Sequence, residues 1–341
     1  DAMDIHGGKA VMRGPKNYMA SGYEAGPIGI TVEGANILTR SLIIFGQGAF
    51  RCHPYVLKEI EAVEQEDVDE SLEQFDRHFF NHVAYTFSNV ARSFVLGISN
   101  KFGDSPVGGQ TENYYKQINR FSAVFALLTD VSMIVLGGSL KRKETLSARL
   151  GDVLSSLYLA STTLKYYEDQ GDKETALPLV HWGCKTLIFE AQNKIHEILL
   201  NFPNRFIAGV LRFFIFPRGK NISGPSIKNT LEIGDLISRK TKTREKLCQG
   251  VYLKDEPTNH LAIMERVLEL YETAHPIKVD IMKALKKGLI EGNTLEELMD
   301  AALNQEIITQ DQADQLNEYD RLALDIINVD DFSEKELKTI R

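Results

Sequence analysis

One carboxylate in the first forty residues stands in a setting that suits proton abstraction. Glu33 lies between Val32 and Gly34, so it has little polar company along the chain. A carboxyl group in an apolar site has its pKa raised toward neutrality, which suits a general base. Gly34 permits close approach of a ligand, and free N–H groups at a following helix start could hold a carbonyl oxygen. The simpler alternative is an acidic first-turn residue favoured by the helix dipole.

Glu33 belongs to the second of two short sequence blocks near the start of the chain. Asp4-Ile5-His6-Gly7-Gly8 predicts the end of a helix at a glycine pair, followed by a loop rich in glycine and proline. Val32-Glu33-Gly34-Ala35 comes next, ahead of Asn36 and Ile37, and Arg40 follows. The blocks resemble the acyl-CoA dehydrogenase family, whose C-terminal domain carries a Q-x-x-G-G motif and then a Y-E-G-T-x-x-x-x-R block. Their order, their separation and the spacing from Glu33 to Arg40 agree with the family pattern.

The rest of the chain resembles the C-terminal extension of the long bacterial fatty acyl-CoA dehydrogenases. The stretches that carry this resemblance are residues 39–48, 138–142, 147–155, 201–205 and 327–332. The resemblance thus covers nearly all 341 residues. It implies a C-terminal part of a longer enzyme, inactive without the family's N-terminal helical and middle β domains.

The resemblance implies a catalytic role for Glu33. It would remove the pro-R α-proton of a fatty acyl-CoA, while the β-hydrogen leaves as hydride to FAD, which gives trans-2-enoyl-CoA in fatty-acid β-oxidation. The backbone N–H of Glu33 would bind the thioester carbonyl, and Gly34 would line the thioester site. Electrons would then pass to an electron-transfer flavoprotein.

The resemblance also implies the contacts with FAD. The flavin cofactor would touch Ala35, Asn36 and Ile37. Asp4 to Gly8 would contact the FAD of a neighbouring subunit in a homo-oligomer. Two positions depart from the family: Asp4 replaces a glutamine and puts a carboxylate near a pyrophosphate, and Ala35 replaces a threonine and removes a hydroxyl contact.

The elements that must position these residues are predicted to be helical. Apolar residues recur at three- and four-residue steps over 68–99, and further helices are predicted over 111–136, 139–168 and 174–200. Long helices with short connections indicate an antiparallel bundle. Because no alternating strand pattern and no internal repeat occurs, the predicted fold class is all-α.

Two domains are predicted within this all-α chain. Residues 1–64 would end the acyl-CoA dehydrogenase C-terminal helical domain with its catalytic loop. Residues 65–341 would form an added helical domain, bundle-like at first and more irregular after Asn201. From Leu261 onward we expect shorter and more polar helices. Thr294 with Glu297 and Ser333 with Glu336 have the capping-box spacing.

Residues 202–220 combine many apolar and aromatic side chains with charges that are only cationic. This composition suits a helix that lies on a membrane surface. The alternative is a hydrophobic helix that packs on the preceding bundle, which we favour because burial most often explains apolar residues. A rival to the enzyme hypothesis follows: the extension would be a non-catalytic membrane-docking or oligomerisation module.

Composition and residue spacing also bear on nucleic-acid binding, on the cellular compartment, on membrane spans and on metal binding. The formal net charge of −8 argues against nucleic-acid binding. Three widely spaced cysteines favour a reducing, cytoplasmic compartment, with association at the inner face of the cell membrane as the option that 202–220 leaves open. The nearest approach to a membrane span carries Asp130, so no transmembrane helix is predicted. His78 and His82 stand four apart, but no third ligand is evident, so we predict helix packing and no metal site.

Overall fold

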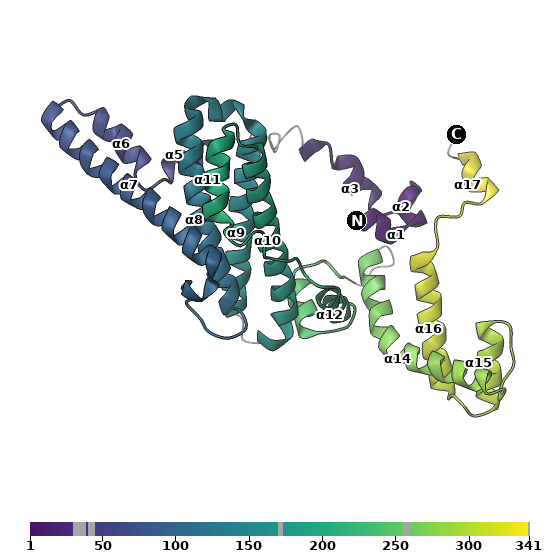
Figure 1. Ribbon diagram of the computed structural model, residues 1–341. Helices are drawn as coiled ribbons and strands as arrows, with labels where there is room; N and C mark the ends of the chain where they lie inside the picture. The colour runs from purple at the N-terminus through teal and green to yellow at the C-terminus, as the bar shows by residue number, and fades with distance from the viewer. Residues whose placement is uncertain (30–38, 40–44, 170–172, 255–258, 340–341) are drawn as a thin grey trace. The chain divides into compact units, whose positions relative to one another are not determined.

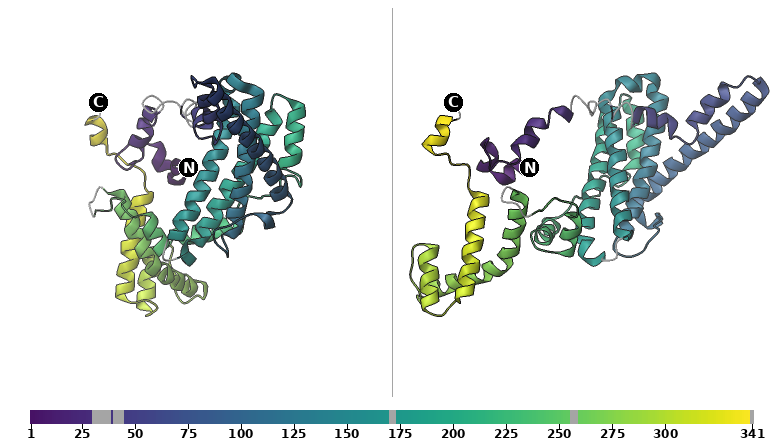
Figure 2. Two further views of the ribbon diagram at one scale, coloured as in Figure 1. Left: turned by 90° about the vertical axis from the view of Figure 1, so that its left-hand side faces the viewer. Right: turned by 180° about the vertical axis from the view of Figure 1, so that it is seen from behind.

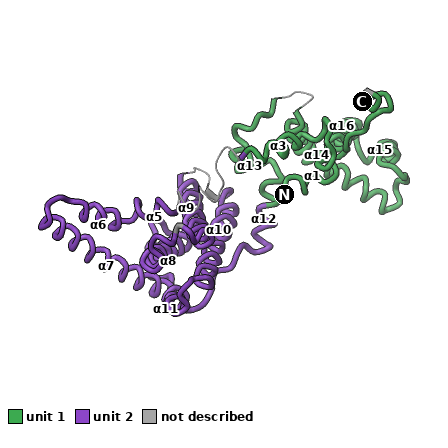
Figure 3. The backbone as a smooth tube through the Cα atoms, turned by 90° about the horizontal axis from the view of Figure 1, so that it is seen from above, with its two compact units in different colours: residues 1–28, 234–341 green, residues 29–233 purple. Residues whose placement is uncertain are grey.

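The computed structural model describes residues 1–29, 39, 45–169, 173–254 and 259–339 (Figure 1). Within these residues every regular element is a helix and no strand occurs, so the all-α prediction is confirmed. The chain divides into two compact units (Figure 3), residues 29–233 and residues 1–28 with 234–341. The predicted domain boundary after residue 64 follows the family's organisation and stays a prediction.

Four long helices build the unit of residues 29–233. They are α7 (Val68–Ile98), α8 (Glu112–Leu136), α9 (Glu144–Asp169) and α10 (Lys173–Asn201). Three of them begin and end close to the predicted bounds. The exception is α9, predicted to begin at Ser139, because the short 3-10 helix η3 (Gly137–Arg142) comes first. Gly137 has a φ of 48°, a conformation that favours glycine and ends α8.

The core of this unit lies along α8, α9 and α10, which run side by side (Figures 1 and 2). Its fully buried side chains come from all three helices and include Phe121, Leu128, Leu150, Leu164, Ile188 and Ile195. Cys184 is also enclosed there, and burial raises the pKa of its thiol to about 12. Apolar stripes from three helices therefore meet in one close-packed interior.

The central helix has the composition of a membrane span as well as of a core helix. Among the described residues, Glu112–Leu140 is the one helical stretch that is long and apolar enough to cross a membrane. Its middle is buried in the bundle at Phe121, Val124 and Leu128, and Asp130 is buried with them. Packing against α9 and α10 accounts for its apolar character.

Two shorter helices accompany α7. They are α5 (Gly48–Arg51) and α6 (Val56–Val63), and α6 lies against α7. Figure 1 shows α6 and the first half of α7 projecting from the other helices of this unit. The α7 N-terminus is capped by Asp67, whose carboxylate accepts N–H bonds from Asp69 and Glu70.

The other unit is built around α14 (His260–Lys286), α15 (Leu295–Asn304) and α16 (Gln310–Ile327). The prediction of short helices after Leu261 is wrong for α14, which has 27 residues and continues through Pro276. Proline removes one hydrogen bond of the helix. Buried side chains on both sides of it offset that loss by packing, namely Leu270, Ala274, Ile277 and Ile281.

Both predicted capping pairs form in this unit. The Thr294 hydroxyl oxygen accepts the N–H of Glu297 at 3.2 Å. Ser333 and Glu336 cap α17 (Glu334–Thr339) reciprocally, since the Ser333 N–H donates to the Glu336 carboxylate at 2.8 Å. A further capping box, not predicted from the sequence, joins Thr309 to Gln312 at the start of α16.

Three shorter helices follow Asn201, where a more irregular structure was predicted. They are α11 (Arg205–Ile215), α12 (Ile227–Ile237) and α13 (Lys242–Leu247). The inner face of α11 is buried on the bundle through Ala208, Leu211 and Ile215. Packing of residues 202–220 on the bundle is therefore confirmed for that face, whereas the opposite face is exposed.

Candidate functional site

The carboxylate predicted to be the catalytic base lies outside the described residues. The same holds for the residues predicted to accompany it, namely Gly34, Ala35, Asn36, Ile37 and Arg40. The roles assigned to Glu33 and to these neighbours remain predictions.

The glycine pair of the first block is described. Helix α1 (Ala2–His6) ends at Gly7, and α2 (Gly8–Val11) begins directly after it. Gly7 has a φ of 57°, and no heavy atom lies within 4 Å of the position that a Cβ would take there. The predicted helix end at the glycines is confirmed, and the backbone at Gly7 is open to a ligand.

The side chains around this turn fit a cofactor only in part. Asp4 and Ile5 point into solvent, since 89% of the Asp4 side chain and 83% of Ile5 are exposed. His6 donates from Nδ1 to the Ala2 carbonyl at 2.7 Å, and its Nε2 hydrogen bonds with the Tyr18 hydroxyl. The exposed turn suits contact with a group held by another subunit. The Asp4 carboxylate does not suit a pyrophosphate, because like charges repel.

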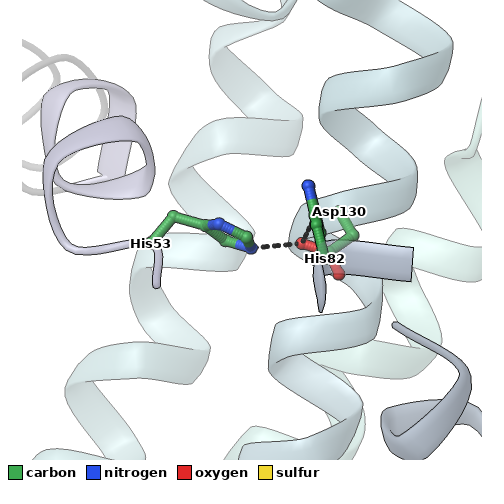
Figure 4. Close-up of side chains that lie close together, drawn as sticks. All are labelled: His53, His82 and Asp130. Carbon is green, nitrogen blue, oxygen red and sulfur yellow. Dashed lines mark hydrogen bonds and ion pairs between the residues drawn. The ribbon is translucent and has the colours of Figure 1, made fainter. Parts of the chain in front are cut away.

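Three side chains from separate segments meet inside the unit of residues 29–233 (Figure 4). His53 lies between α5 and α6, His82 on α7 and Asp130 on α8. One ligand atom from each lies within 4.8 Å of the others. Only 5% of the His53 side chain and none of the Asp130 side chain is exposed.

Hydrogen bonds fix the proton on His53. Its Nδ1 accepts the backbone N–H groups of Tyr55 and Val56, at 3.2 and 3.1 Å, and so caps the start of α6. The ring proton must then be on Nε2, which donates to Asp130 Oδ1 at 2.8 Å. The Thr86 hydroxyl donates to the second carboxylate oxygen at 2.9 Å. The buried Asp130 carboxylate thus has a donor on each oxygen.

His82 differs from His53 in that only one of its ring nitrogens is hydrogen-bonded within the described residues. Its Nδ1 hydrogen bonds with the Glu59 carboxylate at 2.8 Å, and its ring stacks on Tyr55. Its Nε2 is buried, has no hydrogen-bond partner in the part of the chain that the structure describes, and lies 3.7 Å from Asp130 Oδ1. An imidazole held from behind by a carboxylate is oriented as histidine ligands of metals are.

The cluster has the donor types of a transition-metal site, but its hydrogen bonds do not suit one. A metal ion bound at His53 Nε2 would displace the proton from that nitrogen. The proton would then have to be on Nδ1, where it would face the N–H groups of Tyr55 and Val56. The arrangement serves instead as a polar brace that ties α6 and α7 to α8, and His78 contributes no atom to it.

A cavity of about 360 Å³ lies beside this brace. Among the described residues, most of its walls are apolar or aromatic, namely Phe45, Ala49, Phe125, Ala126 and Leu154. His53 and Tyr85 also line it. Such a space fits a small apolar group and offers little hydrogen bonding for a polar one.

A family profile described as acyl-CoA dehydrogenase, C-terminal, bacterial type, matches residues 50–332. The chain belongs to this family. No solved structure matches it.

The matched range shows which described elements belong to this acyl-CoA dehydrogenase domain. It contains all of α7 to α16 and the whole brace of His53, His82 and Asp130. It begins after the block that contains Glu33. The family membership of the domain is shown, whereas the identity of its base rests on the sequence motif.

Proposed function

We propose that this chain is the C-terminal part of an FAD-dependent enzyme that oxidises saturated fatty acyl-CoA to trans-2-enoyl-CoA in β-oxidation. The observation that supports the proposal is the bacterial-type acyl-CoA dehydrogenase match over residues 50–332. The motif Val32-Glu33-Gly34, with Arg40 at the family's spacing, immediately precedes that region.

Glu33 supplies the chemistry of this chain in the proposed reaction. Its carboxylate takes the α-proton of the acyl group, and its backbone N–H holds the thioester carbonyl oxygen, where negative charge develops. FAD, when bound, would supply the acceptor for the β-hydrogen, which leaves as hydride. Gly34 keeps the thioester site free of a side chain.

The cofactor and partners belong to the same proposal. Acyl-CoA dehydrogenases generally use FAD, and Ala35, Asn36 and Ile37 stand where the family contacts it. The open turn at Gly7 suits a flavin held by a second subunit of a homo-oligomer, with Asp4 turned to solvent. A cytoplasmic enzyme that passes its electrons to an electron-transfer flavoprotein completes the proposal. Residues 1–341 alone would be inactive.

The substitution Glu33→Gln in the complete enzyme tests the proposed base. The amide has nearly the same shape but cannot accept a proton. We expect kcat with a saturated fatty acyl-CoA to fall about 10²–10⁴-fold, while bound flavin is retained. The measurement is steady-state oxidation together with the visible absorbance of the flavin.

Glu24→Gln is the matched control. Glu24 lies in the same part of the chain, is half exposed and pairs with Arg13 at 3.2 Å. Because exposed ion pairs contribute little, this variant should keep nearly all turnover. A Glu33→Gln enzyme that holds flavin and turns over at the rate of Glu24→Gln would refute the assignment.

A further inference from the structure

Helix α11 is apolar on two opposite faces. Ala208, Leu211 and Ile215 are buried against the bundle. On the other side Phe206 and Phe213 are 79% and 60% exposed, and Val210 between them is also exposed. These three residues are four and three positions apart, so they form one stripe along the helix. Packing on the bundle explains the inner face, whereas most of the outer stripe stays exposed.

The outer stripe continues onto α7. The ring of Phe94 stacks on Phe213 with centroids 5.5 Å apart and meets Phe214 edge-on at 5.8 Å. On the same face in the second half of α7, two turns before Phe94, Phe87 is 71% exposed. The stripe of α11 and the second half of α7 together form one aromatic surface. Contiguous apolar exposure of this kind marks an interaction site.

A shallow groove runs over the α11 part of this surface. It has a volume of about 550 Å³, and its walls are Arg205, Phe206, Gly209, Val210, Phe213 and Phe214. One side chain among them is polar. Protein partners normally make about one hydrogen bond per 100–200 Å² of interface. A surface with so few polar groups suits the acyl region of a bilayer better than another protein.

The charged side chains on α11 and on α7 after Asp76 are all cationic. No Asp or Glu occurs between Asp76 and Asp104, or between Glu197 and Glu232, although the chain carries a net charge of −8. The exposed cations beside the stripe are Arg205, Arg212, Arg218 and Lys220.

These four cations have no carboxylate partner among the described ion pairs. Arg205 donates to the Leu200 carbonyl at 2.5 Å, and Arg218 to the Ile98 carbonyl at 3.0 Å. Glu197, the nearest acid before them in the chain, pairs with Arg149 and Lys194 instead. Burial lowers the pKa of His196, and the positive charges of Lys220 and Arg212 lower it further. The region therefore has a positive field that an anionic partner would neutralise.

The surface is held firmly in place. The Asn204 side chain caps α11 by accepting the N–H groups of Phe206 and Ile207. At the other end the buried Arg120 guanidinium donates to the Ile215 carbonyl at 3.1 Å. A Cβ at Gly97 would lie 2.8 Å from the Pro217 ring, so glycine is needed where α7 meets the end of α11. The exposed stripe is thus a formed feature of the bundle.

We propose that α11 and the second half of α7 dock this protein onto a membrane that contains anionic phospholipid. Phe206, Val210 and Phe213 enter the acyl region, and the flanking arginines contact the lipid phosphates. A second copy of the chain fits less well, because a symmetric interface would bring Arg205 and Arg212 against each other. The surface lies within residues 50–332 but does not depend on the proposed reaction.

Co-sedimentation with unilamellar vesicles tests the docking surface. The 341-residue chain should bind vesicles of phosphatidylcholine with phosphatidylglycerol, and bind phosphatidylcholine alone weakly. Changing Phe206→Ser with Phe213→Ser should weaken binding roughly tenfold or more, because two apolar anchors are lost. Changing Arg205→Gln with Arg212→Gln should weaken it roughly tenfold and reduce its dependence on salt.

The matched control removes equally exposed apolar side chains elsewhere on the bundle. Ile134 and Tyr158 are 73% and 67% exposed on α8 and α9, and their change to Ser should leave binding nearly unaltered. Circular dichroism and light scattering accompany each sample. If the serine pair at α11 fails to fold, the glutamine pair decides. The proposal would be overturned if the native chain did not bind anionic vesicles, or if the α11 variants bound them as well as the native chain does. It would also be overturned if light scattering showed that the α11 substitutions break up a dimer and leave lipid binding unchanged.

Discussion

At the scale of single residues, the most constrained group is the buried Asp130 carboxylate. It accepts from His53 Nε2 and from the Thr86 hydroxyl, and His53 in turn caps α6. Burial of a carboxylate is costly unless its oxygens are hydrogen-bonded. The brace therefore stabilises the attachment of α6 and α7 to α8 through neutral donors.

Asp130→Ala should lower the free energy of unfolding by about 1–3 kcal/mol, because the His53 Nε2–H is left buried without an acceptor. Asp130→Asn should recover most of this. Its carbonyl oxygen can accept from His53, and its amide can donate to Thr86, whose hydroxyl already lies 3.1 Å from the His82 carbonyl. Urea denaturation measures both variants, with the exposed Asp104→Ala as control. An asparagine variant as unstable as the alanine variant would show that the charge, and not the hydrogen bonds, is what matters.

Little of this brace could be predicted from the sequence. His82 drew attention only through its spacing from His78, which takes no part. His53 and Asp130 come from segments far from His82 along the chain, and local spacing carries no information on such a meeting.

At the scale of elements, helical periodicity predicted most of what is seen. α7 and α8 begin and end within a residue or two of their predicted bounds, because apolar stripes and glycine stops are local properties. The length of α14 was not predicted, because Pro276 is a local stop signal that burial on both sides overrides. The role of α8 needed the structure, since composition alone fits both a core helix and a membrane span.

Two substitutions on α8 test whether it is a core helix or a membrane span. Leu128 is fully buried between helices, whereas Ile134 is 73% exposed. If α8 is the core helix of a folded bundle in water, Leu128→Ala should cost about 2–5 kcal/mol of stability. Ile134→Ala should cost less than about 1 kcal/mol, because little is packed around it. Equal effects in thermal and urea unfolding would contradict the packing described for α8.

At the scale of the whole molecule, an acidic chain contains two long segments without Asp or Glu, 77–103 and 198–231, and they meet where Phe94 stacks on Phe213. The composition of residues 202–220 indicated either a membrane surface or packing on the bundle. The structure assigns packing to one face of α11 and leaves the membrane hypothesis to the other. The family motif at Glu33 and the match over residues 50–332 concern a different part of the chain, so catalysis and docking can fail independently.

The most direct test of the proposed chemistry is a single turnover without oxygen. The complete flavin-loaded enzyme is mixed with a saturated fatty acyl-CoA, and the absorbance of oxidised flavin is followed. We predict rapid loss of that absorbance in the native enzyme and a flavin that stays oxidised in Glu33→Gln. Reduction of the flavin at the native rate in the Glu33→Gln enzyme would contradict the assignment of Glu33 as the base.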